Sequence, residues 1–218
     1  MFIYPAKAEY NRTIPKVKIY TKAKPSKSVK ARFVLQVGEI IWKYKLSPET
    51  TNLAARDGFA EIQVFEIILR QPELDNTVMM AIDRAIPYPI FYRLLYEGQA
   101  KRVAAYKRPA ADSPGKWVTE TYFETDWSKD IAPAMPLPVA LDIKALYEQI
   151  LFAYIDLPRR EGENLDVLVE RAETIRKYRR NLRTLEAKMK SEKQFNRKVE
   201  LNAQVRVLNA RLTKLTSA

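Results

Sequence analysis

Residues Asn164 to Leu215 read NLDVLVERAETIRKYRRNLRTLEAKMKSEKQFNRKVELNAQVRVLNARLTKL, and this stretch decides the architecture of the C-terminal quarter. It contains no proline and no glycine, the residues that interrupt helices most strongly. Large apolar residues recur in it at intervals of seven: Leu168, Ile175, Leu182 and Met189, and further on Leu201, Leu208 and Leu215. This repeat predicts helical segments that each carry a narrow apolar stripe, and a narrow stripe requires a partner surface.

The two heptad tracts do not share one register. If Ile175 and Leu182 occupy one core position, their counterparts Val205 and Leu212 are displaced by two residues. Insertions of three or four residues are known coiled-coil irregularities, and two fits neither. We therefore expect a break between Lys190 and Asn196. The chain either folds back there as a helical hairpin or continues as a distorted helix of about 78 Å.

The partner of the apolar stripe could be the other segment of the arm, a second copy of the chain or a different protein. Homo-oligomer formation and assembly with another protein are both compatible with the pattern. The predicted interface residues are Leu168, Ile175, Leu182, Met189, Phe195, Leu201, Leu208 and Leu215.

Charge is strongly segregated along the chain, which has a net charge of +12. Residues 1–45 carry +9, residues 46–170 carry −7, and residues 171–218 carry +10. Basic ends attract polyanions such as nucleic acid, although the arm could instead lie on its own acidic body. Its basic residues spread around the helix without base-reading geometry, so we expect contacts to phosphate only. These residues are Arg176, Lys177, Arg179, Arg180, Arg183, Lys193, Arg197 and Lys198.

The preceding 157 residues predict an α+β body with a mixed, largely antiparallel sheet and packed helices. Strands are expected at Lys16–Tyr20 (an edge strand), Glu61–Leu69 (central and buried), Ile90–Tyr96, Lys101–Lys107 and Trp117–Thr125. Helices are expected at Val29–Tyr44, after a cap at Asp75 or Asn76, and at Val139–Tyr154. The turn formers and charges at Pro158–Gly162 predict a boundary between a body, Met1–Leu157, and an arm, Pro158–Ala218.

The residue types in the chain exclude several chemistries. Without cysteine and histidine there can be no Ser-His-Asp or Cys-His nucleophile and no zinc site built on these ligands. The five glycines form no phosphate-binding loop, so no cofactor or metal is predicted. A divergent metal-dependent nuclease remains an alternative, with Glu66 and Asp83 as its candidate residues. However, the Glu-x-Lys triplet Glu186–Lys188 falls in the arm and not on a strand.

Several short motifs resemble a known family. They are Lys45–Thr50 with Asn52, Asp83 with Ala85–Pro87, Ala105–Lys107, Thr125 with Trp127, and Lys193–Asn202. Together they resemble the bacterial and archaeal domain-of-unknown-function family number 4391, over about Ala8 to Leu215. Members of that family are typically encoded beside helicases and DNA methyltransferases in restriction-like defence loci against phage. The resemblance implies an accessory subunit of such a system and supplies no catalytic residues.

These observations predict a non-enzymatic accessory subunit whose arm docks a helicase or DNA methyltransferase while its basic residues contact DNA backbone. A pure oligomerisation scaffold and the metal-dependent nuclease are the alternatives. No apolar run reaches the roughly 18 residues that span a bilayer, and the first residues are too short for a signal-peptide core. Together with the absence of cysteine, this favours a cytoplasmic protein.

Overall fold

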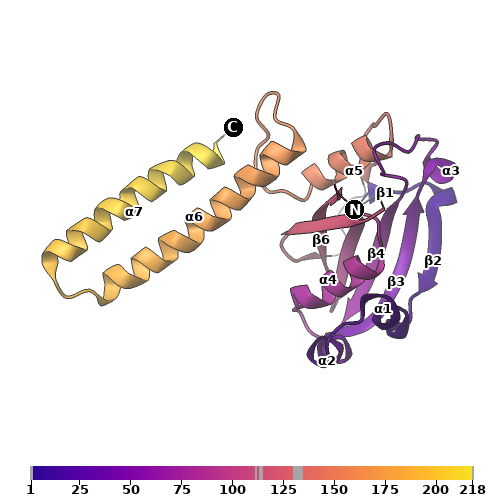
Figure 1. Cartoon of the computed structure of the whole chain (residues 1–218), viewed down its shortest axis with the longest axis horizontal. Helices are drawn as coiled ribbons and strands as arrows, with labels where there is room; N and C mark the ends of the chain where they lie inside the picture. Colours follow the sequence, from indigo (N-terminus) through magenta and orange to yellow (C-terminus); the bar gives the residue numbers. More distant parts are fainter. Residues whose placement is uncertain (1, 111, 113–114, 130–134, 218) are drawn as a thin grey trace. The chain divides into compact units, whose positions relative to one another are not determined.

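The structure is a computed structural model that describes residues 2–110, 112, 115–129 and 135–217 (Figure 1). The chain divides into two compact units, Met1–Ile155 and Asp156–Ala218. The first unit is an α+β domain with a mixed sheet, as the sequence predicts, and the second contains a helical hairpin, one of the two arrangements that the sequence left open. No helix among the described residues is long and apolar enough to cross a membrane.

The main sheet has the strand order β2-β3-β4-β5-β6-β7, with β8 added beside β6. Its neighbours are antiparallel except β4 and β5, which run parallel because helix α4 connects them. The short strands β1 and β9 pair in parallel with each other. The strands are β1 (Phe2–Ile3), β2 (Glu9–Thr13), β3 (Val37–Leu46), β4 (Ile62–Leu69), β5 (Ile90–Tyr96), β6 (Gln99–Pro109), β7 (Trp117–Glu124), β8 (Ser128–Lys129) and β9 (Met135–Pro136).

The helices of the first unit are the short 3-10 helix η1 (Ala6–Ala8), α1 (Lys16–Ala23), α2 (Lys27–Gln36), α3 (Pro48–Thr51), α4 (Asn76–Ala85) and α5 (Ile143–Phe152). Helices α1, α2 and α4 share one hydrophobic core with the sheet. Ile19, Phe33 and Ile82 supply this core from the helices, and Phe65 and Tyr92 supply it from the central strands. These five side chains are at most 2% exposed, so this is the main stabilising layer of the unit.

Aromatic contacts link helix α5 to strand β5 and to the segment before β4. The Tyr147 ring lies 5.1 Å from that of Phe59 and 5.9 Å from that of Phe91, measured between centroids. Phe91 precedes Tyr92 in β5 and points to the other face, because side chains alternate along a strand. Helix α5 therefore covers the sheet face opposite α1, α2 and α4.

The prediction of an edge strand at Lys16–Tyr20 is wrong, because these residues begin helix α1. The alternation of Lys and apolar residues is real, but Val17 is 63% exposed and does not face the core. Ile19 and Ala23, four residues apart, are the buried positions of the helix. Packing of this i, i+4 pair onto the core outweighed the period-two pattern.

The prediction of one helix over Val29–Tyr44 is correct only in its first part. Helix α2 ends at Gln36 and strand β3 begins at Val37. A Cβ atom at Gly38 would lie 3.0 Å from the carbonyl oxygen of Ile68 in β4, so the two backbones approach closely here. Apolar residues on both faces of β3 imitate helical spacing, which explains the error.

Most other predicted elements of the first unit are confirmed. Strand β4 is central and buried, β5 and β6 form the predicted hairpin, and Asp75 caps α4 through the Thr77 amide at 2.8 Å. Helix α5 begins later than predicted, at Ile143, because the Asp142 carboxylate accepts a hydrogen bond from the Ala145 amide. The proline-rich sequence of residues 126–138 predicts a connection before this helix, and residues 130–134 of it lie outside the described residues.

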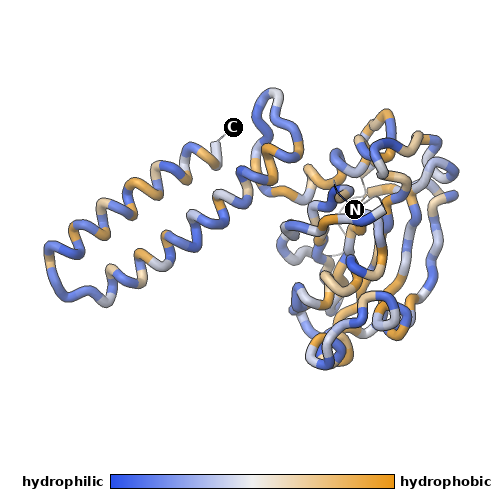
Figure 2. The backbone as a smooth tube through the Cα atoms, in the orientation of Figure 1, coloured by the Kyte–Doolittle hydropathy of each residue, from blue (hydrophilic) through white to orange (hydrophobic). Residues whose placement is uncertain are grey.

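The second unit contains α6 (Leu165–Ser191) and α7 (Phe195–Thr216), which pack side by side. The chain reverses over three residues, within the predicted break. A hairpin therefore forms, and a continuous 78 Å helix does not. Figure 2 shows apolar residues recurring at intervals along two mostly hydrophilic helices. Asn164 caps α6 through the Val167 amide at 3.0 Å.

Candidate partner and nucleic-acid interface

The seam between α6 and α7 uses most of the predicted interface residues. Leu168 and Ile175 are buried, as is Val205 on α7. The remaining heptad residues are half-buried: Leu182, Met189, Leu201, Leu208 and Leu215. The arm's other segment is thus one partner of each stripe, and two helices alone cover these stripes incompletely.

Phe195 differs from the other predicted interface residues. It is the first residue of α7, at the turn of the hairpin, and is 77% exposed. Val199 and Val207 on the same helix are 53% and 54% exposed. Exposed aromatic and branched apolar side chains on a narrow helical hairpin are suited to contact with another macromolecule.

The middle of α6 carries a stripe of arginines on one side. Arg176, Arg179, Arg180 and Arg183 follow the i, i+3, i+4, i+7 spacing that brings side chains together on a helix surface. The expectation that charge spreads around the helix therefore does not hold for these four residues. Of the five predicted contact residues on α6, only Lys177 lies outside the stripe. We call these four residues the arginine stripe.

The arginine stripe is uninterrupted by acidic residues, and Glu173 and Glu186 flank its two ends. No acidic residue occurs between Glu173 and Glu186. Arg179, Arg180 and Arg183 are exposed, and Arg176 is half-exposed. The stripe spans about 10 Å along the helix axis at 1.5 Å per residue. Guanidinium groups arranged in this way can bind successive phosphates or carboxylates.

A second basic group surrounds the turn of the hairpin, where Lys193, Arg197 and Lys198 are exposed. Glu192 organises the turn by accepting hydrogen bonds from the amides of Lys193 and Gln194, at 2.8 and 2.9 Å. These amide bonds, and then the nearby Arg197 and Lys198, lower the pKa of the Glu192 carboxyl. The Glu192 carboxylate therefore stabilises the turn, and basic side chains surround it.

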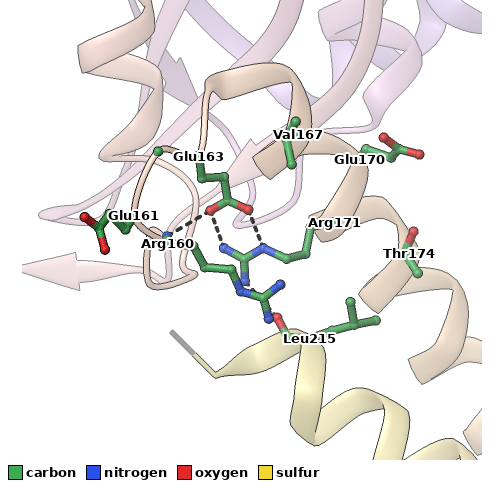
Figure 3. Close-up of a pocket in the computed structure, with 9 residues that line it drawn as sticks. Arg160, Glu161, Glu163, Val167, Glu170, Arg171, Thr174 and Leu215 are labelled. Atoms are coloured by element: carbon green, nitrogen blue, oxygen red, sulfur yellow. Dashed lines mark hydrogen bonds and ion pairs between the residues drawn. The ribbon is translucent and has the colours of Figure 1, made fainter.

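The other end of the hairpin is closed by a buried ion pair (Figure 3). Arg171 donates from Nε and Nη2 to the two carboxylate oxygens of Glu163, both at 2.7 Å. Its Nη1 donates to the Leu215 carbonyl at the end of α7, and Nη2 also donates to the Pro158 carbonyl, both at 2.7 Å. One guanidinium thus links the segment before α6 to the end of α7.

Arg160 adds to this closure, because its guanidinium donates to the carbonyls of Lys214 and Ser217. These are among the last carbonyls of α7, which have no partners within the helix. The two arginines line a groove of about 500 Å³ together with Glu161, Gly162, Glu163, Val167, Glu170, Thr174 and Leu215. The guanidinium groups of Arg160 and Arg171 donate to acceptors of the protein itself. We therefore assign the groove a structural role at the closed end of the hairpin.

The two carboxylates of the nuclease hypothesis are not brought together. Glu66 lies between Phe65 and Ile67, which face α4, so its side chain points to the opposite sheet face. There it accepts a bond from Arg93 at 2.5 Å. Asp83 belongs to α4 itself. No group of three or more His, Cys, Asp or Glu side chains in the described part of the chain is placed to hold a metal ion.

Asp83 is instead part of a buried polar cluster that the sequence reasoning missed. The Lys107 ammonium lies 2.9 Å from Asp83 Oδ1, and the Tyr122 hydroxyl donates to Asp83 Oδ2 at 2.5 Å. Lys107 Nζ also donates to the carbonyls of Asp83, Ile86 and Tyr88. Burial lowers the pKa of Lys107, and the Asp83 carboxylate partly opposes that shift. Burial and then the Asp83 charge raise the pKa of Tyr122.

This cluster fixes the end of α4 and the following turn to strand β6. Lys107 is completely buried and Asp83 is 4% exposed, so solvent does not reach the pair freely. Asp83 and Lys107 each belong to one of the short motifs named in the sequence. The sequence does not predict their contact, because 24 residues separate them and a lysine on a strand is ordinarily exposed. We assign the cluster a structural role.

The first unit and the hairpin together define a class: an α+β domain followed by a basic helical hairpin. A family model described as "Domain of unknown function (DUF4391)" matches residues 2–212, and the chain belongs to that family. The resemblance drawn from the sequence motifs is thereby confirmed. No curated protein and no solved structure matches the chain.

Proposed function

We propose that the protein is a non-catalytic accessory subunit that binds nucleic-acid backbone and a partner protein through its helical hairpin. The observation that carries the proposal is the arginine stripe. Four arginines share one side of α6, with no acidic residue in the surrounding 12 positions. Duplex DNA presents regularly spaced phosphates to such a surface, and contact would release condensed counterions.

The non-catalytic part of the proposal is supported by how the candidate carboxylates are engaged. Glu66 is neutralised by Arg93, and Asp83 is neutralised by Lys107. Both side chains are almost fully buried, at 7% and 4% exposure. A hydrolytic metal site requires carboxylates that converge on one accessible point, so these two residues favour structural roles.

The partner part of the proposal combines the exposed apolar residues of the hairpin with the family resemblance. Phe195, Val199 and Val207 supply apolar surface beside basic groups. The resemblance implies a helicase or a DNA methyltransferase as the partner, in a restriction-like system for defence against phage. This assignment places the protein in the cytoplasm. The alternative is that a second copy of the chain covers the exposed apolar residues of the hairpin.

DNA binding tests the first half of the proposal. We expect the full chain to bind a 30-base-pair duplex, with an affinity that falls steeply with salt. The four phosphate contacts of the stripe contribute about −3.6 to the slope in a plot of log K against log salt, or roughly a hundredfold loss between 50 and 200 mM. Changing Arg176, Arg179, Arg180 and Arg183 together to Glu should remove this contribution.

A matched control has the same charge change on other parts of the hairpin. It replaces Lys188, Lys190, Arg206 and Arg211 with Glu, and all four are exposed. Fluorescence anisotropy of both variants separates a specific stripe from general electrostatic attraction. Equal losses in the two variants would contradict the role of the stripe.

Affinity purification of the tagged protein from its native host tests the second half. We expect a helicase or methyltransferase to co-purify in stoichiometric amount, as identified by mass spectrometry. Recovery of the chain only as a homo-oligomer would reject the accessory-subunit assignment in favour of a scaffold.

A further inference from the structure

A second basic surface lies on the first unit, far along the sequence from the hairpin. Between Glu9 and Glu39 the chain has eight Lys or Arg residues and no Asp or Glu. These residues are Arg12, Lys16, Lys18, Lys22, Lys24, Lys27, Lys30 and Arg32. Most belong to helices α1 and α2, which follow each other with only three residues between them.

Some of these basic side chains have partners within the protein, and others are exposed without an ion pair to any described residue. Lys16 donates to the Val37 carbonyl at 2.5 Å, and Arg32 pairs with Asp75 at 3.1 Å. By contrast, Lys18, Lys22, Lys24 and Lys27 are exposed, and none has an ion pair with another of the residues that the structure describes. We call these four residues the lysine surface.

Local backbone geometry places the lysine surface on the outside of the domain. Ile19 and Ala23, about 100° around the helix from Lys18 and Lys22, turn toward the core. Lys18 and Lys22 stand four residues apart and share one side of the helix. Lys24 ends α1 in a left-handed conformation, with φ of 46°, and the chain then turns into α2 through Pro25.

Neighbouring elements extend the positive surface. Helix α4 packs against α1 and carries the exposed residue Arg84 in its last turn. Lys30 on α2 is also exposed, and its Nζ lies 5.5 Å from the centre of the Tyr20 ring on α1. The positive surface thus includes residues of α1 and α2, and the neighbouring helix α4 adds one exposed arginine to the domain.

We propose that the lysine surface is a second nucleic-acid contact, which binds phosphates without reading sequence. This inference rests on the proposed function only in its choice of nucleic acid as the ligand. The residues belong to a different unit of the chain. Two separate basic surfaces would let one chain hold two segments of nucleic acid or a longer stretch of one.

The residue types favour nucleic acid over a protein partner. The surface consists of lysines, which are depleted in protein interfaces, whereas arginine and aromatic residues are enriched there. Lysine acts as a point charge toward phosphate and needs no bidentate geometry. Contacts to phosphate do not need side chains that form hydrogen bonds with base edges.

The lack of exposed aromatic side chains on α1 and α2 disfavours a membrane surface. Interfacial helices combine basic residues with exposed Trp, Phe or Leu on one face. Tyr20 is half-buried and Phe33 is fully buried, so α1 and α2 expose no aromatic side chain that could anchor in lipid headgroups. The aliphatic residues Val17, Val34 and Leu35 of these helices are exposed, so binding to phosphatidylserine vesicles is measured beside binding to DNA.

The test uses the full chain with Lys18, Lys22 and Lys27 changed together to Gln. Gln keeps helix propensity and removes only charge. Its control changes Lys7, Lys116 and Lys129 to Gln, which removes the same charge from exposed positions elsewhere in the unit. Binding of a 60-base-pair duplex is measured by anisotropy between 50 and 200 mM salt. Circular dichroism confirms that both variants remain folded.

We expect the α1–α2 variant to reduce the slope of log K against log salt by about 2.7, for three lost phosphate contacts, and the control to leave it within 0.5. Affinity at 100 mM salt should fall at least tenfold in the first variant and less than twofold in the control. Equal behaviour of the two variants would overturn the inference. The inference would also be overturned if the α1–α2 variant lost binding to phosphatidylserine vesicles, or to polyglutamate, and kept its binding to DNA.

The arginine-stripe variant is measured in parallel to separate the two proposals. If that variant loses DNA binding and the α1–α2 variant does not, the lysine surface fails alone. If the α1–α2 variant loses binding and the stripe variant does not, the DNA-binding part of the proposed function fails alone.

Discussion

The Nζ atom of Lys107 lies 2.9 Å from Oδ1 of Asp83, and both side chains are buried. Strand β6 supplies the lysine and helix α4 the aspartate. The same ammonium reaches three backbone carbonyls at the end of α4 and in the turn that follows. A charged pair in this position is costly to break, because either partner would remain as an isolated buried charge.

The change Lys107→Ala should therefore lower the free energy of unfolding by about 3–5 kcal/mol. It leaves the buried Asp83 carboxylate without a cation and removes the donor from three carbonyls. Adding Asp83→Leu should recover only part of the loss, because the carbonyls stay without Lys107. Urea unfolding followed by circular dichroism measures both variants. A loss below 1 kcal/mol for Lys107→Ala would show that water or other groups replace the pair.

The Arg171–Glu163 pair predicts a similar effect in the hairpin. Arg171→Ala removes the link to Glu163, Pro158 and Leu215, and we expect a destabilisation of about 3–5 kcal/mol. Arg211→Ala on the exposed surface of α7 is the control, with an expected change within about 0.5 kcal/mol. Hydrogen exchange of α7 amides locates the effect. Unchanged protection of α7 in the Arg171 variant would rule out its role as a closure.

The same pair should make hairpin stability depend on pH. The Arg171 guanidinium holds the pKa of the Glu163 carboxyl below its ordinary value of 4.5. A depressed carboxyl pKa contributes stability that is fully present above pH 4.5 and is lost as pH falls through the folded pKa. The difference in urea midpoint between the wild type and Glu163→Gln should thus be largest near pH 7 and shrink below about pH 4.5. A difference independent of pH would contradict the ion pair.

Val205 and Val207 provide a matched test of the helical seam. They are two residues apart on α7, at 9% and 54% exposure. Val→Ala raises helix propensity by about 0.5 kcal/mol at either position, so the difference isolates packing. We expect Val205→Ala to be less stable than Val207→Ala by about 1.5–2 kcal/mol in urea unfolding. Equal stabilities would mean that the seam does not persist in solution.

Phe195 tests partner docking without disturbing the fold. Because its side chain is 77% exposed, Phe195→Ala should change the free energy of unfolding by less than about 0.5 kcal/mol. Recovery of the co-purifying helicase or methyltransferase should fall at least tenfold, as expected for an aromatic anchor. Val167→Ala, which is 50% exposed near the start of α6, serves as the control. Full recovery with Phe195→Ala would move the docking site away from the turn.

The elements that sequence reasoning identified share a strong local signal. The continuous apolar run of β4, the Asp75 cap of α4 and the two-residue mismatch between the arm's tracts each fixed an element or a break. The errors at α1 and β3 arose where two periodicities fit the same residues. There the choice depended on which surface each side chain could bury, and that surface belongs to other parts of the chain.

By itself, the sequence determined that the basic, proline-free stretch Asn164–Leu215 is helical and has two heptad tracts with a break near Lys193, because helix formation and heptad phase are local properties. It also determined the uneven charge. Only the tertiary structure decided that the arm closes as a hairpin through Arg171, and that Lys107 and Asp83 neutralise each other in the interior. Both pairs join residues whose proximity depends on the fold, and burial of each charge is tolerated only because its partner arrives there too.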